Sequence, residues 1–250
     1  MKKLIGCLAI AGLAAGAAVA ASGEADYQAG MKALASKDFS NALGRLEAAL
    51  AAEPDSIRFG SEYRQAVIQA KEYDRCIKFF EKLTADSPAA SNGFLNYGFA
   101  YVDKIPASGA ITQVILANTA LSFFTKSIDI KPSWIALYTR GNSYLYWPKI
   151  FGRAHLGVAD LEKAMAMQKS QGGKKSYHSR AFVSLGDGYW KMENIEKAKA
   201  TWKEGLALFP DHSGLKARLS KDGDDLKSYI DDVLDPNKRV DTNLIEIWTN

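Results

Sequence analysis

The sequence lacks most of the features that mark specialised protein classes. Its 32 Lys and Arg residues nearly balance 28 Asp and Glu residues, and no strongly basic tract occurs. A nucleic-acid-binding surface needs basic residues concentrated on one face, so nucleic-acid partners are not expected. With 47% hydrophobic and 24% charged residues, the composition also excludes collagen, a disordered polymer and a polytopic membrane protein.

The first twenty residues have the layout of a secretory signal peptide. Met1-Lys2-Lys3 is followed by an uncharged stretch rich in Ala and Leu, and Ala18-Val19-Ala20 is a small-residue cleavage motif. We therefore predict a signal peptide over residues 1–20, cleavage after Ala20 and export to a bacterial periplasm. The alternatives are an uncleaved membrane anchor and lipidation at Cys7, because Leu4-Ile5-Gly6-Cys7 resembles a lipobox.

Cysteine is scarce in the predicted mature chain. Removal of residues 1–20 removes Cys7 and leaves Cys76 as the single cysteine, so no internal disulfide can form. The fold must therefore be stabilised by packing, which is feasible at this length.

The prolines of the chain follow a regular spacing. Pro54 and Pro88 are 34 residues apart, and Pro132 and Pro210 follow at spacings of 44 and 78 residues. Each of these prolines comes just after an apolar segment with helical periodicity, where proline ends a helix. The spacing indicates a repeated unit of about 34 residues with inserts in two copies.

The residues at fixed places in these units carry a family resemblance. The clearest copy has Leu185, Gly186, Tyr189, Asn194, Ala198, Trp202 and Pro210. At these residues the chain resembles the tetratricopeptide repeat family, whose unit is a pair of antiparallel helices. The second copy departs from the pattern, because Arg64 and Cys76 stand where Gly and Ala are usual.

The resemblance implies an all-α, right-handed solenoid of helical hairpins with about five repeats over residues 21–213. The expected repeats cover about 23–56, 57–90, 91–133, 134–175 and 179–212. Residues 214–250 should form a capping helix and an extended tail that folds back on the last repeat. Small residues such as Gly186 should let paired helices approach closely, while Trp202 should fill the core beside them.

No residue pattern in the chain indicates catalysis or a bound cofactor. The three histidines, His155, His178 and His212, lack metal-ligand spacing, and we expect the latter two to be exposed polar residues. There is no phosphate-binding loop and no nucleophile elbow. Cys76 is expected to be a buried small hydrophobic residue. The sequence therefore predicts no catalytic residue, no metal site, no cofactor and no enzymatic activity.

The resemblance also implies a binding surface, because the first helix of each unit lines a concave groove in this family. The groove positions hold aromatic, Arg and amide residues of the kind found at interaction hot spots. They are Tyr27, Arg58, Gln65, Asn92, Phe99, Tyr138, Asn142, Tyr146, Arg180, Asp187 and Trp190. Some of them, Phe99 included, can instead pack against neighbouring helices. Tyr27 and Met31 replace the Lys and Asn that bind chaperone carboxylates in some members, so that ligand is not expected.

Two inserts interrupt consecutive repeats, over Ile105–Val114 and Trp147–Gly157. The second contains Trp147, Ile150 and Phe151, which either plug the solenoid locally or form an apolar contact patch. Both alternatives stay open at the level of sequence.

Together these features predict a non-catalytic scaffold for protein–protein interaction in the bacterial periplasm. Its groove would bind a segment of a periplasmic or envelope-associated protein, with no membrane span after signal cleavage. One alternative is a small-molecule or transport-associated periplasmic binding protein that uses the groove and the inserts as a pocket. Another is a protein that self-associates through its end repeats.

Overall fold

The computed structural model describes residues 23–236, 238 and 240–249. Across these residues the chain is helical, with connecting loops and no strand. The predicted all-α class is confirmed. The predicted signal peptide, its cleavage site and Cys7 lie outside the described residues. Within them, no helix is long and apolar enough to cross a membrane.

The chain divides into two compact units. The first contains the described residues up to Ile105 together with Thr242–Leu244, and the second contains Pro106–Asp241 and the residues from Ile245 onward. The division falls between the two helices of the third predicted repeat. The two units are described separately below.

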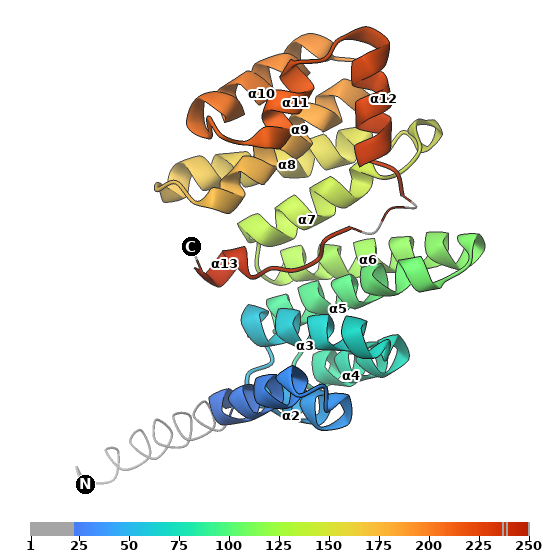
Figure 1. Ribbon diagram of the computed structural model, residues 1–250, viewed down its shortest axis with the longest axis vertical. Coiled ribbons are helices and arrows are strands. Elements are labelled where there is room, and N and C mark those ends of the chain that lie inside the picture. Colours follow the sequence, from blue (N-terminus) through green and yellow to red (C-terminus); the bar gives the residue numbers. More distant parts are fainter. Residues whose placement is uncertain (1–22, 237, 239, 250) are drawn as a thin grey trace, which may run out of the picture. The chain divides into compact units, whose positions relative to one another are not determined.

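The first unit is built from five consecutive helices among its described residues. Residues 23–35 are helical, followed by α2 (Phe39–Ala52), α3 (Ile57–Ala70), α4 (Tyr73–Asp86) and α5 (Ser91–Lys104). Helix α2 contacts α3, α4 contacts α5, and α3 contacts α5 (Figure 1). The fully buried side chains include Leu43, Leu46, Phe59, Tyr63, Phe80 and Leu95.

The turns between paired helices repeat the same backbone conformation. Lys37, Lys71 and Glu193 all have positive φ angles, of 62°, 60° and 64°. A left-handed residue lets the chain leave the first helix sharply, although non-glycine residues adopt it at some cost. Lys37 and Lys71 are 34 residues apart in the sequence, so the repeat period is also visible in the backbone.

The second unit continues the pattern, and two of its helices, α6 and α8, are longer than those of the first unit. It contains α6 (Ala110–Ile130), α7 (Trp134–Leu145), α8 (Ala154–Gln171), α9 (Ser179–Lys191) and α10 (Ile195–Leu208). Helices α7 and α8 pack as one pair and α9 and α10 as another, with α8 against α9 (Figure 1). Short 3-10 turns occur at Ile105–Ala107, on the boundary between the units, and at Lys149–Phe151 and Ser176–His178. The unit ends in α11 (Ser213–Leu219), α12 (Gly223–Val233) and α13 (Glu246–Thr249).

The packing of α9 on α10 depends on a glycine facing a tryptophan. Trp202 is fully buried, as predicted. A Cβ atom on Gly186 would lie 2.1 Å from Nε1 of Trp202, so no larger residue fits without a shift. The indole N–H donates to the carbonyl of Val183 at 3.3 Å, which satisfies its polar group in the core.

The first insert forms a 3-10 turn at Ile105–Ala107 and, from Ala110, additional turns at the N-terminus of α6. Helix α6 has 21 residues, whereas α2 and α4 each have 14. The added turns at its N-terminus leave Ile111, Val114 and Ile115 exposed on the surface of the second unit.

The expectation for the tail is wrong in two respects. Thr242–Leu244 belongs to the first unit and not to the last repeat, because Ser61 and Arg64 hydrogen-bond its backbone. The tail is also not extended throughout, since it ends in the short helix α13.

The expectation that His178 is exposed is also wrong. Its side chain is buried, with the rings of Trp134 and Tyr177 at centroid distances of 5.6 and 4.8 Å. Cys76 is buried, as expected for a small packing residue.

Candidate functional site

The residues expected to line a groove lie on the first helix of each pair or at its end. In the first unit they come from residues 23–35, α3 and α5, and in the second unit from α7 and α9. Most of them are half-buried, which leaves part of each side chain accessible to a partner. Tyr27, Phe99 and Asp187 are buried.

Arg58 and Tyr27 form an aromatic and cationic cluster at the start of the first unit. The Tyr27 and Phe59 rings stack with centroids 4.8 Å apart, and the Arg58 guanidinium lies 4.6 Å from the centre of the Tyr27 ring. Arg58 also pairs with Glu24. Burial raises the pKa of the Tyr27 hydroxyl, so this ring stays neutral. The stacked, half-exposed Arg58 can contact a carboxylate or an aromatic side chain of a partner.

A buried polar cluster centres on Arg64 of α3. This side chain has no exposed surface, and its Nε and Nη1 donate to Asn96 and Asp103 of α5 at 2.9 and 2.8 Å. Its third donor, Nη2, reaches the carbonyl of Thr242 at 2.9 Å. A buried guanidinium is tolerated only when its hydrogen bonds and charge are satisfied, as they are here.

Sequence reasoning missed the Arg64 cluster as a site, although a signal was present. Arg64 stands at a position where the repeat family usually has glycine. An arginine where two helices normally come into close contact must find buried partners, and α5 supplies them. A departure from the repeat pattern that introduces a charge was therefore the informative feature.

The other predicted residues of the first unit lie around this cluster. Phe99 lies beneath Arg64, with the guanidinium carbon 4.5 Å from its ring centre. Asn92 is held by Asp55, which accepts from its backbone N–H at 2.6 Å. The Nε2 atom of Gln65 is buried and has no hydrogen-bond partner.

The groove positions of the second unit include a group of hydroxyl and amide residues. The Ser184 hydroxyl of α9 donates to Oδ1 of Asn142 of α7 at 2.8 Å. Burial raises the pKa of Tyr146, the residue after α7, to about 12, and burial also raises the pKa of Tyr138. Both phenols therefore stay protonated at neutral pH and remain hydrogen-bond donors.

Asp187 does not present its carboxylate for direct contact with a partner. It is 2% exposed and accepts from Nε and Nη2 of Arg218 at 2.5 and 2.6 Å. Burial raises the pKa of this carboxyl, and the guanidinium of Arg218 opposes that shift. Its role here is to fix α9 against α11.

Arg180 and Trp190 occupy the two ends of α9 and are half-buried. Arg180 pairs with Glu246 of α13 at 3.1 Å, and both side chains are partly exposed. The Nζ of Lys149 lies 5.5 Å from the centre of the Trp190 ring. Both residues can therefore still take part in binding.

The second insert combines the two alternatives that the sequence left open. Trp147 is 9% exposed, with the Arg153 guanidinium carbon 3.7 Å from its ring centre and Phe151 packed edge-on. Ile150 and Phe151 are 90% and 56% exposed. The tryptophan therefore acts as a local plug, while the two following apolar residues form a surface patch.

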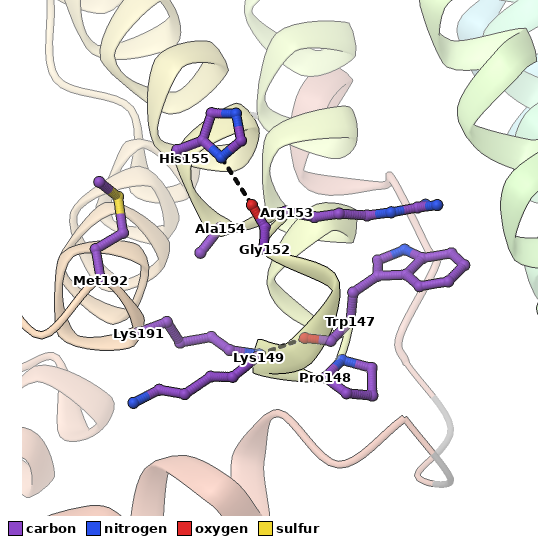
Figure 2. A pocket seen from close by; sticks show the side chains of 9 residues that line it. All are labelled: Trp147, Pro148, Lys149, Gly152, Arg153, Ala154, His155, Lys191 and Met192. Atoms are coloured by element: carbon purple, nitrogen blue, oxygen red, sulfur yellow. Dashed lines mark hydrogen bonds between the residues drawn. The ribbon is translucent and has the colours of Figure 1, made fainter.

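A cavity of about 190 Å³ lies beside this insert (Figure 2). Its lining includes Trp147, Lys149, Arg153, His155 and Lys191, but not Phe151. Figure 2 shows Lys191 reaching the carbonyl of Trp147, at 2.8 Å. Burial lowers the pKa of the Lys191 ammonium group.

The cationic groups of this cavity already have partners. Lys149 pairs with Glu193, and Arg153 donates to Asn118 of α6 at 2.9 Å. His155 Nδ1 lies 2.7 Å from the carbonyl oxygen of Gly152. The cavity offers no group prepared for a ligand. Across the described part of the chain, no group of three or more His, Cys, Asp or Glu residues could hold a metal ion.

Sequence comparison gives a family match for one part of the chain. Residues 33–92 match the family model described as Tetratricopeptide repeat. This segment covers the second helix of the first predicted repeat and the whole of the next helix pair. Among proteins with curated functions, none matches the sequence.

Solved structures with the same fold extend the comparison to most of the chain. A thermophilic TPR protein of Thermus thermophilus, TTC0263, aligns with a TM-score of 0.55 and 18% identity over 79% of this chain and 97% of that chain. YrrB, described as a TPR protein with an unusual peptide-binding site, aligns with a TM-score of 0.53 and 15% identity over 78% of this chain and 91% of that chain. MamA aligns with a TM-score of 0.51 and 15% identity over 75% of this chain and 91% of that chain.

At such identities these structures establish the fold alone. That fold, an all-α helical solenoid of the tetratricopeptide type, is the one that the family resemblance of the sequence implies. The family match covers residues 33–92, and over most of the chain the likeness to solved structures shows a fold of the tetratricopeptide type.

Proposed function

We propose that this protein is a non-catalytic scaffold of the bacterial periplasm that binds a segment of a partner protein on the first-helix face of its repeats. Tetratricopeptide repeats bind protein partners, and YrrB, which shares the fold, is described as having a peptide-binding site. A peptide segment is therefore the ligand class that we propose for this chain.

One observation carries the proposal. Tyr138, Asn142 and Tyr146 on or just after α7 and Trp190 on α9 are all half-buried, and the Ser184 hydroxyl of α9 donates to Asn142. Such side chains combine a large apolar surface with a polar group, which suits a surface that must bind a peptide and tolerate water when free.

Partner capture from a bacterial envelope fraction tests this function. The wild-type chain should retain at least one partner that the double variant Tyr138→Ala/Trp190→Ala loses. Tyr189→Ala is the matched control, because this aromatic residue of α9 directs its hydroxyl to Glu162 of α8 instead. If wild type and double variant capture the same proteins in equal amounts, the groove assignment is wrong.

The periplasmic location rests on the pattern of residues 1–20. N-terminal sequencing of the protein from a periplasmic extract should find a chain that begins at Ala21. A chain retained in the membrane with Met1 intact, or one that begins at a lipid-modified Cys7, would contradict this location.

Small-molecule binding is the alternative function, and the cavity beside Trp147 does not favour it. At about 190 Å³ it is smaller than the roughly 300–1,000 Å³ of typical ligand pockets. Its cationic side chains are also engaged by protein groups. A protein partner is therefore the stronger proposal.

A further inference from the structure

A short segment near the C-terminus belongs to the first unit, although α12 before it belongs to the second. This segment, Thr242–Leu244, is grouped with the helices of the first unit. The side chains of Thr242 and Leu244 are 4% and 6% exposed, so both are buried among those helices. We call Thr242–Leu244 the tail segment.

The first unit binds the tail segment through its backbone as well as its side chains. Arg64 Nη2 donates to the carbonyl of Thr242 at 2.9 Å, and the N–H of Leu244 donates to Oγ of Ser61 at 3.2 Å. The hydroxyl of Thr242 donates to Oδ1 of Asp103. A carbonyl and an N–H two residues apart are thus both recognised, as when a protein binds an extended peptide.

The groups that receive the segment are themselves fixed and buried. Ser61 and Arg64 have no exposed surface, and Asp103 is 5% exposed. Asn96 and Asp103 hold the guanidinium of Arg64 in place. These residues come from α3 and α5, the first helices of two consecutive predicted repeats. We call Ser61, Arg64 and Asp103 the tail site.

The arrangement is that of a binding site filled by a tethered ligand. Without the segment, the buried Nη2 of Arg64 would lose its acceptor and Ser61 would lose its donor. Such groups strongly favour an occupant that supplies the same hydrogen bonds. Tethering supplies that occupant at a high effective concentration, even when its intrinsic affinity is low.

We propose that the tail site is a peptide-binding site that the chain's own tail segment covers until a partner displaces it. The displacing segment is extended, with Thr or Ser followed two positions later by an aliphatic residue. The first residue matches Asp103 through its hydroxyl, and the second fills the place of Leu244. This inference rests on the proposed scaffold function and adds the ligand class and its regulation.

The residues that follow the tail segment allow such an exchange. Beyond Leu244, the described ion pair of the tail is Glu246 with Arg180, at 3.1 Å, and both side chains are partly exposed. Exposed pairs contribute little to stability. Release of the tail segment therefore requires the loss of the three hydrogen bonds at the tail site and exposure of the Leu244 side chain.

Binding of a labelled peptide with the sequence of residues 240–249 to the full chain tests the proposal. Leu244→Asp should release the tail segment, because it places a charge in a buried position while the tail site stays intact. This variant should bind the peptide at least about ten-fold more tightly than wild type, whose site is covered. Ile245→Asp makes a similar change at a neighbouring residue that is 44% exposed and should bind like wild type.

Two further variants keep the outcome decisive. Thr242→Val replaces one hydroxyl by a methyl group, so this variant should fold even if Leu244→Asp does not. It should raise the affinity for the labelled peptide by a smaller factor than Leu244→Asp. Adding Arg64→Lys to the Leu244→Asp variant should abolish the gain in peptide affinity. The single ammonium nitrogen of Lys cannot replace the three guanidinium nitrogens that donate to Asn96, Asp103 and the peptide carbonyl. Folding of each variant is checked by its helical circular dichroism.

Equal peptide affinity in wild type and in folded releasing variants would overturn the proposal. So would light scattering that shows a wild-type dimer and a Leu244→Asp monomer, because the tail segment would then bind a second copy. Partner capture through Tyr138 and Trp190 in the second unit can succeed while the peptide test fails. The two proposals are therefore tested separately.

Discussion

Asp187 and Arg218 form a buried, doubly hydrogen-bonded ion pair between α9 and α11. The two N···O distances are 2.5 and 2.6 Å, and the side chains are 2% and 6% exposed. Arg218→Leu would leave a carboxylate buried without a counter-charge. We expect the free energy of unfolding at pH 7 to fall by about 3–5 kcal/mol, measured by urea denaturation.

The double variant Asp187→Leu/Arg218→Leu separates the cost of the orphaned charge from the value of the pair. It should be more stable than Arg218→Leu alone, since no buried charge remains. Lys216→Ala is the control on the same helix, because its contact with Asp211 is exposed and 3.7 Å long. That change should stay within about 0.5 kcal/mol of wild type. A double variant as unstable as the single one would show that the helix packing, not the charge, dominates.

Trp202 should contribute as a core residue of the last helix pair. Trp202→Ala removes a fully buried indole and should lower the free energy of unfolding by about 3–5 kcal/mol. Gly186→Ala should also destabilise, because its Cβ would lie 2.1 Å from the indole nitrogen. The penalty of Gly186→Ala should be much smaller when Trp202 is already Ala, which a double-mutant cycle measures.

Gly44 provides the matched control for Gly186. It also lies inside a helix, α2, but a Cβ there meets nothing within 4 Å. Gly44→Ala should therefore stabilise the protein by up to about 1 kcal/mol through helix propensity alone. If both glycine variants shift stability in the same direction, close packing against Trp202 is not the reason for Gly186.

The sequence predicted those parts of the fold that local patterns determine. Proline ends helices and glycine permits close helix contact, so Pro88 and Gly186 indicate the repeat without knowledge of distant contacts. The buried position of Trp202 follows from the same pattern. Each repeat contacts mainly its neighbours, and this makes a solenoid unusually readable from its period.

The candidate site was only partly predictable, because it depends on contacts between residues far apart in the chain. Thr242 meets Arg64 across a sequence separation of 178 residues, and Asp187 meets Arg218 across 31. No periodicity encodes such pairs. The burial of His178 likewise depends on Trp134 from another helix pair. Local patterns placed Arg64 and Asp187 on helices but could not show which distant residues would cover them.

Stability should decrease in mild acid because of His178. Burial lowers the pKa of its imidazole below the ordinary 6.5, so the folded protein keeps it neutral while the unfolded chain takes up a proton. Stability is therefore full above pH 6.5, falls as the pH drops below that value, and levels off below the folded pKa. Melting temperatures between pH 7.5 and 5.0 should show this loss, and His178→Asn should reduce it.

His212 has to be considered in the same experiment. Burial, followed by the charge of Arg218, lowers its pKa as well, so it contributes with the same sign. The double variant His178→Asn/His212→Asn should show the smallest loss of stability in acid. His155→Asn, at an exposed histidine, is the control and should behave like wild type. An undiminished loss in the double variant would assign the acid sensitivity to other groups.

In the second insert, we expect buried Trp147 to contribute to stability and exposed Ile150 to contribute only to surface contact. Trp147 is 9% exposed and lies under the Arg153 guanidinium, so Trp147→Ala should cost about 3 kcal/mol or more in urea denaturation. Ile150 is 90% exposed, so Ile150→Ser should change stability by no more than about 0.5 kcal/mol. If the patch of Ile150 and Phe151 contacts a partner, Ile150→Ser should weaken envelope capture at an unchanged melting temperature. A drop in melting temperature for Ile150→Ser as large as that for Trp147→Ala would mean that the whole insert acts as a plug.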